Sequence, residues 1–264
     1  MNPLQRSLIE KLGHDHGFEH VLPGAPHTVA LASARHGARA DVSLLSGAEG
    51  LFMIVEAATP ALLPEMRRTF PNLSFAAGFA ASSEAELAAL LRRAASLARA
   101  LPSQAARDFE SEVSRRLSEL PKGLGDTEVE RLVRQRVGQQ KFRSAMLDYW
   151  GGACAVTGLA MPELLRASHA KPWAECSTDA ERLDVFNGFL LVANLDALFD
   201  GFLVSFDDAG VMLVSPRLSV DIQNRLGLRQ GMALRWLSDQ HRRYLAWHRE
   251  RLHAIAGRSG MRAD

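Results

Sequence analysis

Apolar residues in the first hundred positions follow two spacings, one typical of helices and one typical of short strands. Residues 4–12 have helical spacing, and residues 60–69 are expected to form a second, short helix. Short apolar or alternating runs predict strands at 28–33, 40–45, 51–57 and 72–79. We therefore expect residues 1–101 to form an N-terminal α/β domain.

Two longer helices are predicted after these strands. Ser83 and Glu86 have the spacing of a capping box, so Ser83 is expected to precede a helix that Pro102 ends. A second amphipathic helix is expected over about 103–120, and the sequence Pro-Lys-Gly-Leu-Gly that follows at 121–125 is typical of a linker. Residues 102–125 are therefore predicted to be a helical connector.

The remaining part of the chain, residues 126–264, has a different pattern. One long helix is expected to begin at Asp126 or Thr127 and to continue to about residue 150. Beyond it the pattern predicts a strand–loop–strand–helix unit, with its elements at 164–170, 175–184, 189–192 and 194–200. The stretch 218–256 is expected to be mostly helical. The predicted fold class is α+β.

Composition narrows the class of protein. Of the 264 residues, 47% are hydrophobic and 23% are charged, which is the balance of a globular protein. No apolar run approaches the roughly 20 residues that cross a bilayer, and the first 20 residues have no apolar leader. We therefore expect no membrane association. The two cysteines, Cys154 and Cys176, form no C-x-x-C pair, which argues against a cysteine zinc site and fits a cytoplasmic protein.

Charge is distributed unevenly, although the net charge is only +1. Residues 151–215 carry −6, between +2 over 121–150 and +6 over 216–264. Carboxylates between basic flanks are suited to a cation-dependent enzyme that acts on a polyanion. Unevenly charged, solvated helix faces are the alternative.

Two polar clusters occur in the N-terminal domain. His14, Asp15, His16 and His20 lie close together in the sequence and could bind a metal, but a loop with solvated histidines is the commoner explanation. The stretch 35–39 is a polar turn between two predicted strands, where contacts to a ligand are common.

The strand–loop–strand–helix unit carries the residues that phosphodiester hydrolysis requires. His169 can serve as the base for water because the free imidazole has a pKa near neutrality. Asp196 and Asp200 are four residues apart on one helix face and are hard ligands suited to Mg²⁺ or Mn²⁺. Asn187 can brace the loop. Taken singly, each residue also fits a structural role: a buried histidine, an Asn-Gly turn, a helix cap and a helix stop.

In this order, the set resembles the HNH endonucleases of the ββα-metal type, especially the restriction-type branch. The likeness runs from about residue 126 to 252 and rests on several separate segments. These are the helix with Arg136, Gly138, Gln139, Phe142 and Arg143, and the segments 154–158, 167–173, 187–188, 195–200 and 244–249. The resemblance implies that residues 126–264 are a ββα-metal nuclease domain with flanking helices.

The resemblance also implies roles for the site residues. His169 would be the general base, Asn187 would stabilise its loop, and Asp196 would bind the metal where relatives have a histidine. Asp200 would be a second ligand, whereas Ser168 stands where some relatives have one. Many relatives brace this unit with a cysteine-bound zinc. Here we expect packing to replace it, around Phe186, Phe189, Leu198, Phe199 and Trp173.

Basic and amide side chains on the flanking helices and after the first strand of the unit are candidates for DNA binding through phosphate contacts, although a solvated helix face is the commoner role of such residues. They are Arg136, Gln139, Lys141, Arg143, Lys171, Arg242 and Arg243. The resemblance adds the expectation of a homodimer, because double-strand cleavage by a single HNH site requires two copies.

Three functional hypotheses follow. The first is a metal-dependent DNA endonuclease with a restriction or phage-defence role and an N-terminal recognition domain. The second is a DNA-binding module that has lost catalytic activity. The third is a signal-gated effector nuclease, which a ligand pocket in the N-terminal domain would favour over the first.

Overall fold

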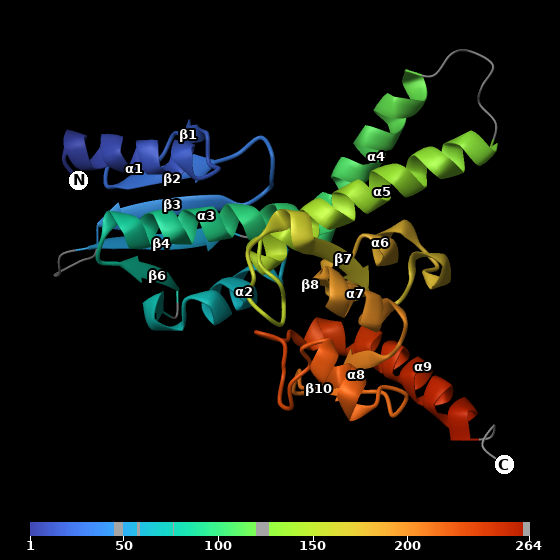
Figure 1. Ribbon diagram of the computed structural model, residues 1–264. Coiled ribbons are helices and arrows are strands. Elements are labelled where there is room, and N and C mark those ends of the chain that lie inside the picture. The colour runs from blue at the N-terminus through green and yellow to red at the C-terminus, as the bar shows by residue number, and fades with distance from the viewer. Residues whose placement is uncertain (45–49, 57–58, 76, 120–126, 261–264) are drawn as a thin grey trace. The chain divides into compact units, whose positions relative to one another are not determined.

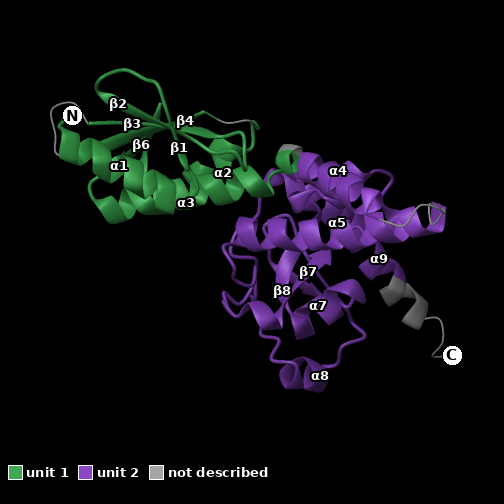
Figure 2. Ribbon diagram, turned by 90° about the horizontal axis from the view of Figure 1, so that it is seen from above, with its two compact units in different colours: residues 1–104 green, residues 105–264 purple. Residues whose placement is uncertain are grey.

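The computed structural model describes residues 1–44, 50–56, 59–75, 77–119 and 127–260 (Figure 1). The chain divides into two compact units, Met1–Gln104 and Ala105–Asp264 (Figure 2). The predicted linker at 121–125 lies outside the described residues.

The described part of unit 1 contains one six-stranded sheet in which every neighbouring pair is antiparallel. Its strand order is β1 (His20–Leu22), β2 (Thr28–Ala32), β3 (Arg39–Leu44), β4 (Leu51–Glu56), β6 (Gly78–Ala81) and β5 (Ser74–Phe75). The N-terminal domain therefore contains both helices and strands, as expected, but its sheet is antiparallel, whereas the sheet of a typical α/β domain is mainly parallel. Short connections between successive strands allow antiparallel pairing, whereas parallel strands need a long crossover.

Three helices accompany this sheet: α1 (Pro3–Asp15), α2 (Leu62–Thr69) and α3 (Glu84–Ala100). A one-turn 3₁₀ helix, η1 (Pro71–Leu73), precedes β5. Helices α1 and α3 pack against each other and against the sheet (Figure 2). Ile9, Leu31 and Leu90 are fully buried in this layer.

The cap of α3 confirms the prediction from the sequence and adds one detail. The Ser83 hydroxyl accepts a hydrogen bond from the Glu86 backbone N–H at 3.2 Å. The Glu86 carboxylate accepts from the backbone N–H and the hydroxyl of Ser82, rather than from Ser83 itself. The helix ends at Ala100, and α4 (Pro102–Ser118) begins at the predicted break.

Helix α4 contacts α5 (Thr127–Trp150) in unit 2 through a small hydrophobic cluster, and the two helices diverge beyond it (Figure 1). Phe109 and Val113 of α4 form a buried cluster with Val137 of α5 and Leu183. Most of the predicted connector is therefore part of the second unit.

The predicted strand–loop–strand–helix unit is present. Strand β7 (Leu165–His169) pairs antiparallel with β8 (Gly188–Val192), and α7 (Ala193–Asp200) follows directly. The loop between the strands contains α6 (Asp179–Arg182) and two one-turn 3₁₀ helices, η3 (Trp173–Glu175) and η4 (Val185–Asn187), while η2 (Pro162–Leu164) precedes β7.

The C-terminal part was predicted to be mostly helical, and this is correct only at its two ends. Helices α8 (Val220–Arg225) and α9 (Arg242–Gly260) are separated by an irregular stretch that ends in η5 (Asp239–His241). A small hairpin of β9 (Val204–Phe206) and β10 (Met212–Val214) precedes α8.

Aromatic packing holds unit 2 together, as expected. Phe186, Phe189 and Phe199 are fully buried, and Phe189 contacts Phe199 edge to face at 5.6 Å. Leu198 is buried and Trp173 is half-buried. The C-terminal turn of α5 joins this core through Trp150, which stacks on Trp236 at 4.4 Å.

Candidate active site

His169 is the last residue of β7, and its ring is held on two sides. It stacks on Phe142 of α5 at 3.7 Å and meets Trp173 edge to face at 6.0 Å. Its Nε2 lies 2.8 Å from the Arg182 carbonyl oxygen. Because a carbonyl only accepts, Nε2 carries the proton, which leaves the lone pair on Nδ1.

Burial makes this imidazole a neutral base at neutral pH. Its pKa falls to about 4, because the surrounding apolar groups disfavour the charged form, while the Arg182 carbonyl opposes that shift. A general base must be unprotonated when it meets its substrate. His169 meets this requirement throughout the physiological pH range.

Asn187 lies at the opposite end of the loop and is completely buried. Its Oδ1 accepts from the Lys171 N–H at 2.8 Å, while Nδ2 donates to the carbonyls of Lys171 and Glu181, both at 3.1 Å. Nδ2 also lies 3.3 Å from Cys176 Sγ. One amide thus connects both ends and the middle of the loop that follows His169, which is the geometry expected of a brace.

Gly188, the residue after this amide, faces His169 across the strand pair. A Cβ at this position would lie 2.2 Å from the Ser168 carbonyl oxygen and 2.8 Å from the Phe142 ring. The Asn-Gly pair therefore has a packing reason beyond turn formation, since only glycine allows the strands to approach so closely.

Two carboxylates lie on α7, one turn apart. The Ser168 hydroxyl donates a short hydrogen bond to Asp196, so this aspartate is next to the residue that precedes His169. The pKa of Asp200 rises to about 6, because partial desolvation of its carboxylate and then the charge of Asp196 disfavour ionisation, although the residue as a whole is exposed. Neither carboxylate has an ion-pair partner within the described part of the chain.

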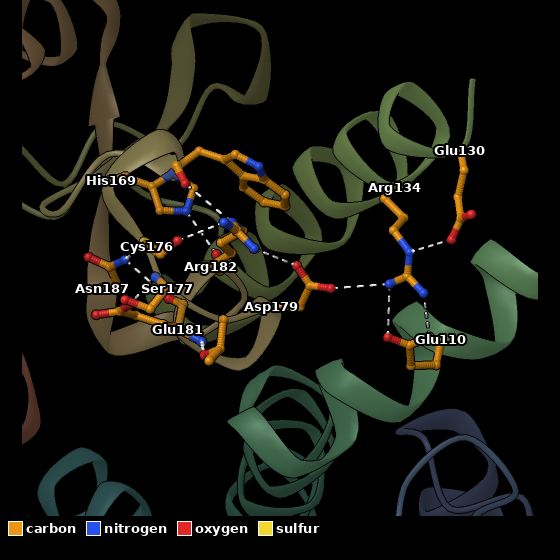
Figure 3. A network of polar contacts seen from close by, with 12 residues as sticks. Glu110, Glu130, Arg134, His169, Cys176, Ser177, Asp179, Glu181, Arg182 and Asn187 are labelled. Atoms are coloured by element: carbon orange, nitrogen blue, oxygen red, sulfur yellow. Dashed lines mark hydrogen bonds and ion pairs between the residues drawn. The ribbon is translucent and has the colours of Figure 1, made fainter. Parts of the chain in front are cut away.

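A network of charged side chains holds Arg182, the residue whose carbonyl oxygen contacts His169 (Figure 3). The Arg182 guanidinium donates to the carbonyls of Trp173 and Cys176, at 3.2 and 2.6 Å, and pairs with Asp179 at 2.9 Å. Asp179 also pairs at 3.1 Å with Arg134 of α5, which in turn contacts Glu110 of α4 and Glu130. The same residue whose carbonyl orients His169 is therefore connected to both long helices.

Sequence reasoning missed this network. Asp179 and Arg182 have the i, i+3 spacing of a helical ion pair, which was the available signal. Their connection to Arg134 spans 45 positions and has no signature in a single sequence.

Three of the predicted DNA-binding side chains are engaged within the protein. Arg143 donates to the carbonyls of Leu165 and Pro162, at 2.7 and 2.9 Å, which joins α5 to the start of β7. Lys171 pairs with Glu181 at 2.7 Å and is mostly buried. Arg243 donates at 2.6 Å to the buried carboxylate of Asp184, which also accepts from the Tyr244 hydroxyl.

The other predicted DNA-binding side chains are accessible to different degrees. Arg136 and Gln139 are exposed on α5 and have no polar partner among the described residues, and Lys141 is half-buried. Arg242 pairs with Asp239 at 3.3 Å and is more than half exposed. These four residues, together with the exposed side of Arg243, are available for an external contact.

The described residues contain no group of three or more histidine, cysteine, aspartate or glutamate side chains arranged to hold a metal ion. The potential ligands at the site are therefore the two α7 carboxylates. Cys154 and Cys176 are free, buried thiols.

Residues 154–207 match the family model described as HNH endonuclease. This segment spans β7, β8 and α7, and it includes His169, Asn187, Asp196 and Asp200. No curated protein sequence matches the chain. Among the described helices, none is long and apolar enough to span a membrane.

Proposed function

We propose that this chain, in which residues 154–207 are an HNH nuclease domain, is a metal-dependent endonuclease that hydrolyses DNA phosphodiester bonds. One observation carries the proposal. Asn187 braces the loop that begins after His169, and His169 is a neutral base with a free Nδ1. The Ser168–Asp196 hydrogen bond brings α7 to the same end of β7.

The chemistry of His169 follows from its hydrogen bond. Nδ1 accepts a proton from the attacking water as the new oxygen–phosphorus bond forms. The imidazolium that results keeps its Nε2–H on the Arg182 carbonyl, which stabilises the positive charge and prevents the ring from turning.

A divalent cation fits the α7 carboxylates. Desolvation and the neighbouring charge of Asp196 raise the Asp200 pKa, and neither carboxylate has an ion-pair partner within the described chain, so a cation would compensate their charges. Asp196 and Asp200 would hold it, and Mg²⁺ and Mn²⁺ suit a site with few protein ligands because they retain water and bind phosphate oxygens. When bound, the ion would stabilise the negative charge that develops on the leaving oxygen.

We further propose a restriction or phage-defence role in the cytoplasm, with unit 1 choosing the DNA and two copies of the chain cutting both strands. The homodimer can be checked by light scattering coupled to gel filtration. We expect a mass near twice 28.9 kDa, and a monomeric mass with DNA bound would contradict it.

Replacement of the base tests the proposed mechanism directly. We expect His169→Ala to slow nicking of supercoiled plasmid by about 100-fold or more, the usual contribution of a general base. The variant should remain folded by circular dichroism, and its DNA affinity should remain close to that of the wild type. His253→Ala, which removes an exposed histidine on α9, is the matched control. Nicking at the wild-type rate by the His169 variant would exclude this residue from the mechanism.

Metal dependence has a separate test. Asp196→Ala and an excess of EDTA should each stop cleavage, whereas Mg²⁺ or Mn²⁺ should restore it only after EDTA. Cleavage that persists in EDTA would contradict the proposal. If the wild type binds DNA but does not cut it with either ion, the chain is instead a DNA-binding module without activity.

A specific observation favours the alternative of a signal-gated effector. Unit 1 contains a cavity of about 440 Å³ that charged side chains line, and its volume is within the range of small-molecule sites. Its chemistry is considered next.

A further inference from the structure

The cavity in unit 1 lies between the end of α1, the loop that follows it, and one face of α3. Arg92 and Arg99 line it from α3, and Arg35 lines it from the connection between β2 and β3. The two α3 residues are seven positions apart, so both guanidinium groups lie on the same helix face. Three arginines that are distant in the sequence therefore meet in one cavity.

Two of these arginines have no internal role. Arg35 and Arg92 are exposed, and within the described part of the chain neither guanidinium has a hydrogen-bond or ion-pair partner. Arg99 is half-buried and donates to the Ser96 hydroxyl at 3.3 Å. The planar guanidinium group of arginine matches the oxygens of a phosphate group, so these three arginines suit the cavity to an anion.

The lining of the cavity also contains hydrogen-bond acceptors. Glu19 accepts from the Ser33 hydroxyl at 2.8 Å and from the Ala34 N–H at 3.0 Å. Hydrogen bonding to its own backbone N–H, together with these two contacts, lowers the pKa of Glu19 to about 2. Asp15, at the end of α1, also lines the cavity. Both carboxylates can accept from ligand hydroxyl or amino groups, such as those of a sugar or a base.

The loop after α1 and the helix α3, which both line the cavity, pack closely against each other. Gly17 has φ +99°, and a Cβ there would lie 2.8 Å from the Ala95 Cβ. The loop after α1 therefore contacts α3 directly, in a backbone conformation that favours glycine. This contact keeps the loop that leads to Glu19 beside the helix that carries Arg92 and Arg99.

We propose that this cavity binds a nucleoside monophosphate, with the phosphate on Arg35, Arg92 and Arg99 and the sugar or base donors on Asp15 and Glu19. The volume of about 440 Å³ is much larger than one phosphate group needs and is within the range of small-molecule sites. Free phosphate lacks the sugar and base groups that Asp15 and Glu19 would bind.

A metal site is a poorer explanation of the same residues. His14, Asp15 and His16 line the cavity, but His20 belongs to β1 and does not. The described residues contain no metal-binding group of three such ligands, and three guanidinium groups in one cavity repel a cation.

The test is direct binding to the full-length chain, measured by isothermal titration calorimetry in EDTA. The probes are AMP and GMP, with adenosine, guanosine and inorganic phosphate as partial ligands. We expect at least one of the two nucleotides to bind, and its nucleoside and phosphate alone to bind at least tenfold more weakly. Arg35→Gln and Arg92→Gln should each weaken that nucleotide by about tenfold, since each removes a charged hydrogen bond. Arg229→Gln removes an exposed arginine in unit 2 and should change nothing.

Several outcomes would overturn the proposal: no binding of either nucleotide, phosphate binding as tightly as the nucleotides, or affinity that does not depend on Arg35 and Arg92. A short DNA duplex that binds in place of the nucleotides, and loses affinity in both variants, would assign the arginines to DNA instead. Binding is measured without cleavage, so failure here leaves the nuclease proposal unaffected, and the reverse is also true.

Discussion

Two buried imidazoles in unit 2 have different relationships to the site. His169 uses one ring nitrogen internally and keeps the other free, whereas His248 uses both. His248 lies 2.9 Å from the Ser205 hydroxyl and 3.0 Å from the Phe199 carbonyl, and it stacks on the Phe199 ring at 3.9 Å. It therefore connects α9 to the helix that carries the two aspartates, and its role is structural.

His248 predicts how stability depends on pH. Burial lowers its pKa to about 4 in the folded protein, whereas the unfolded chain has a value near 6.5. The unfolded state therefore binds more protons between these values, and the free energy of unfolding decreases as pH falls through this window. For this group we expect a loss of about 2 kcal/mol between pH 7.5 and pH 5.

Urea unfolding followed by circular dichroism at the two pH values measures this effect. His248→Gln should be less stable than the wild type at pH 7.5 but should lose about 2 kcal/mol less on acidification. An equal loss in both proteins would show that His248 does not contribute. His253→Gln, with its side chain exposed on the same helix, is the control.

At the scale of elements, α6 is the part that positions the base. We expect Asp179→Ala to lower kcat by about tenfold, because the loop loses the ion pairs that hold Arg182 and α5 in place. DNA affinity should not change. The matched control is Glu130→Ala, which contacts Arg134 but not the loop. Equal effects of the two substitutions on kcat would indicate only a general loss of stability.

Elements with strong local signals were predicted from the sequence. The cap at Ser83, the break at Pro102, and strands β2, β3 and β4 are present close to their expected positions. Strands β1, β9 and β10 were missed because a three-residue strand shows too little alternation to identify. The run at 72–79, expected as one strand, contains β5 and β6, which pair with each other.

The site was predictable to a similar extent. The order of His169, Asn187 and Asp196 identified the unit, because each residue follows a local element. The internal partners of Arg143 and Lys171 were not predictable, since an exposed arginine and one that holds a distant carbonyl look alike in sequence. Tertiary contacts, which a single sequence does not encode locally, determine which basic residues remain free for DNA.

At the scale of the whole molecule, the division after Gln104 leads to a prediction about separability. Unit 2 contains its own aromatic core, the base, both aspartates and the α4–α5 pair. We expect the fragment 105–264 to fold, to unfold cooperatively on heating, and to nick plasmid DNA with Mg²⁺ or Mn²⁺.

Circular dichroism and a plasmid assay on this fragment check the prediction. Its cleavage should be less selective among DNA sequences than that of the full chain, if unit 1 chooses the substrate. A folded fragment that cuts with unchanged selectivity would assign that choice to unit 2. An unfolded fragment would show that the core of unit 2 is not sufficient.

The acceptor that orients the His169 ring is a peptide oxygen, and every amino acid at position 182 would provide the same atom. An alanine scan cannot delete it, so the scan would report only on side chains that maintain the path of the main chain. Replacing that peptide bond by an ester, through semisynthesis, would instead weaken the acceptor while leaving each side chain unchanged.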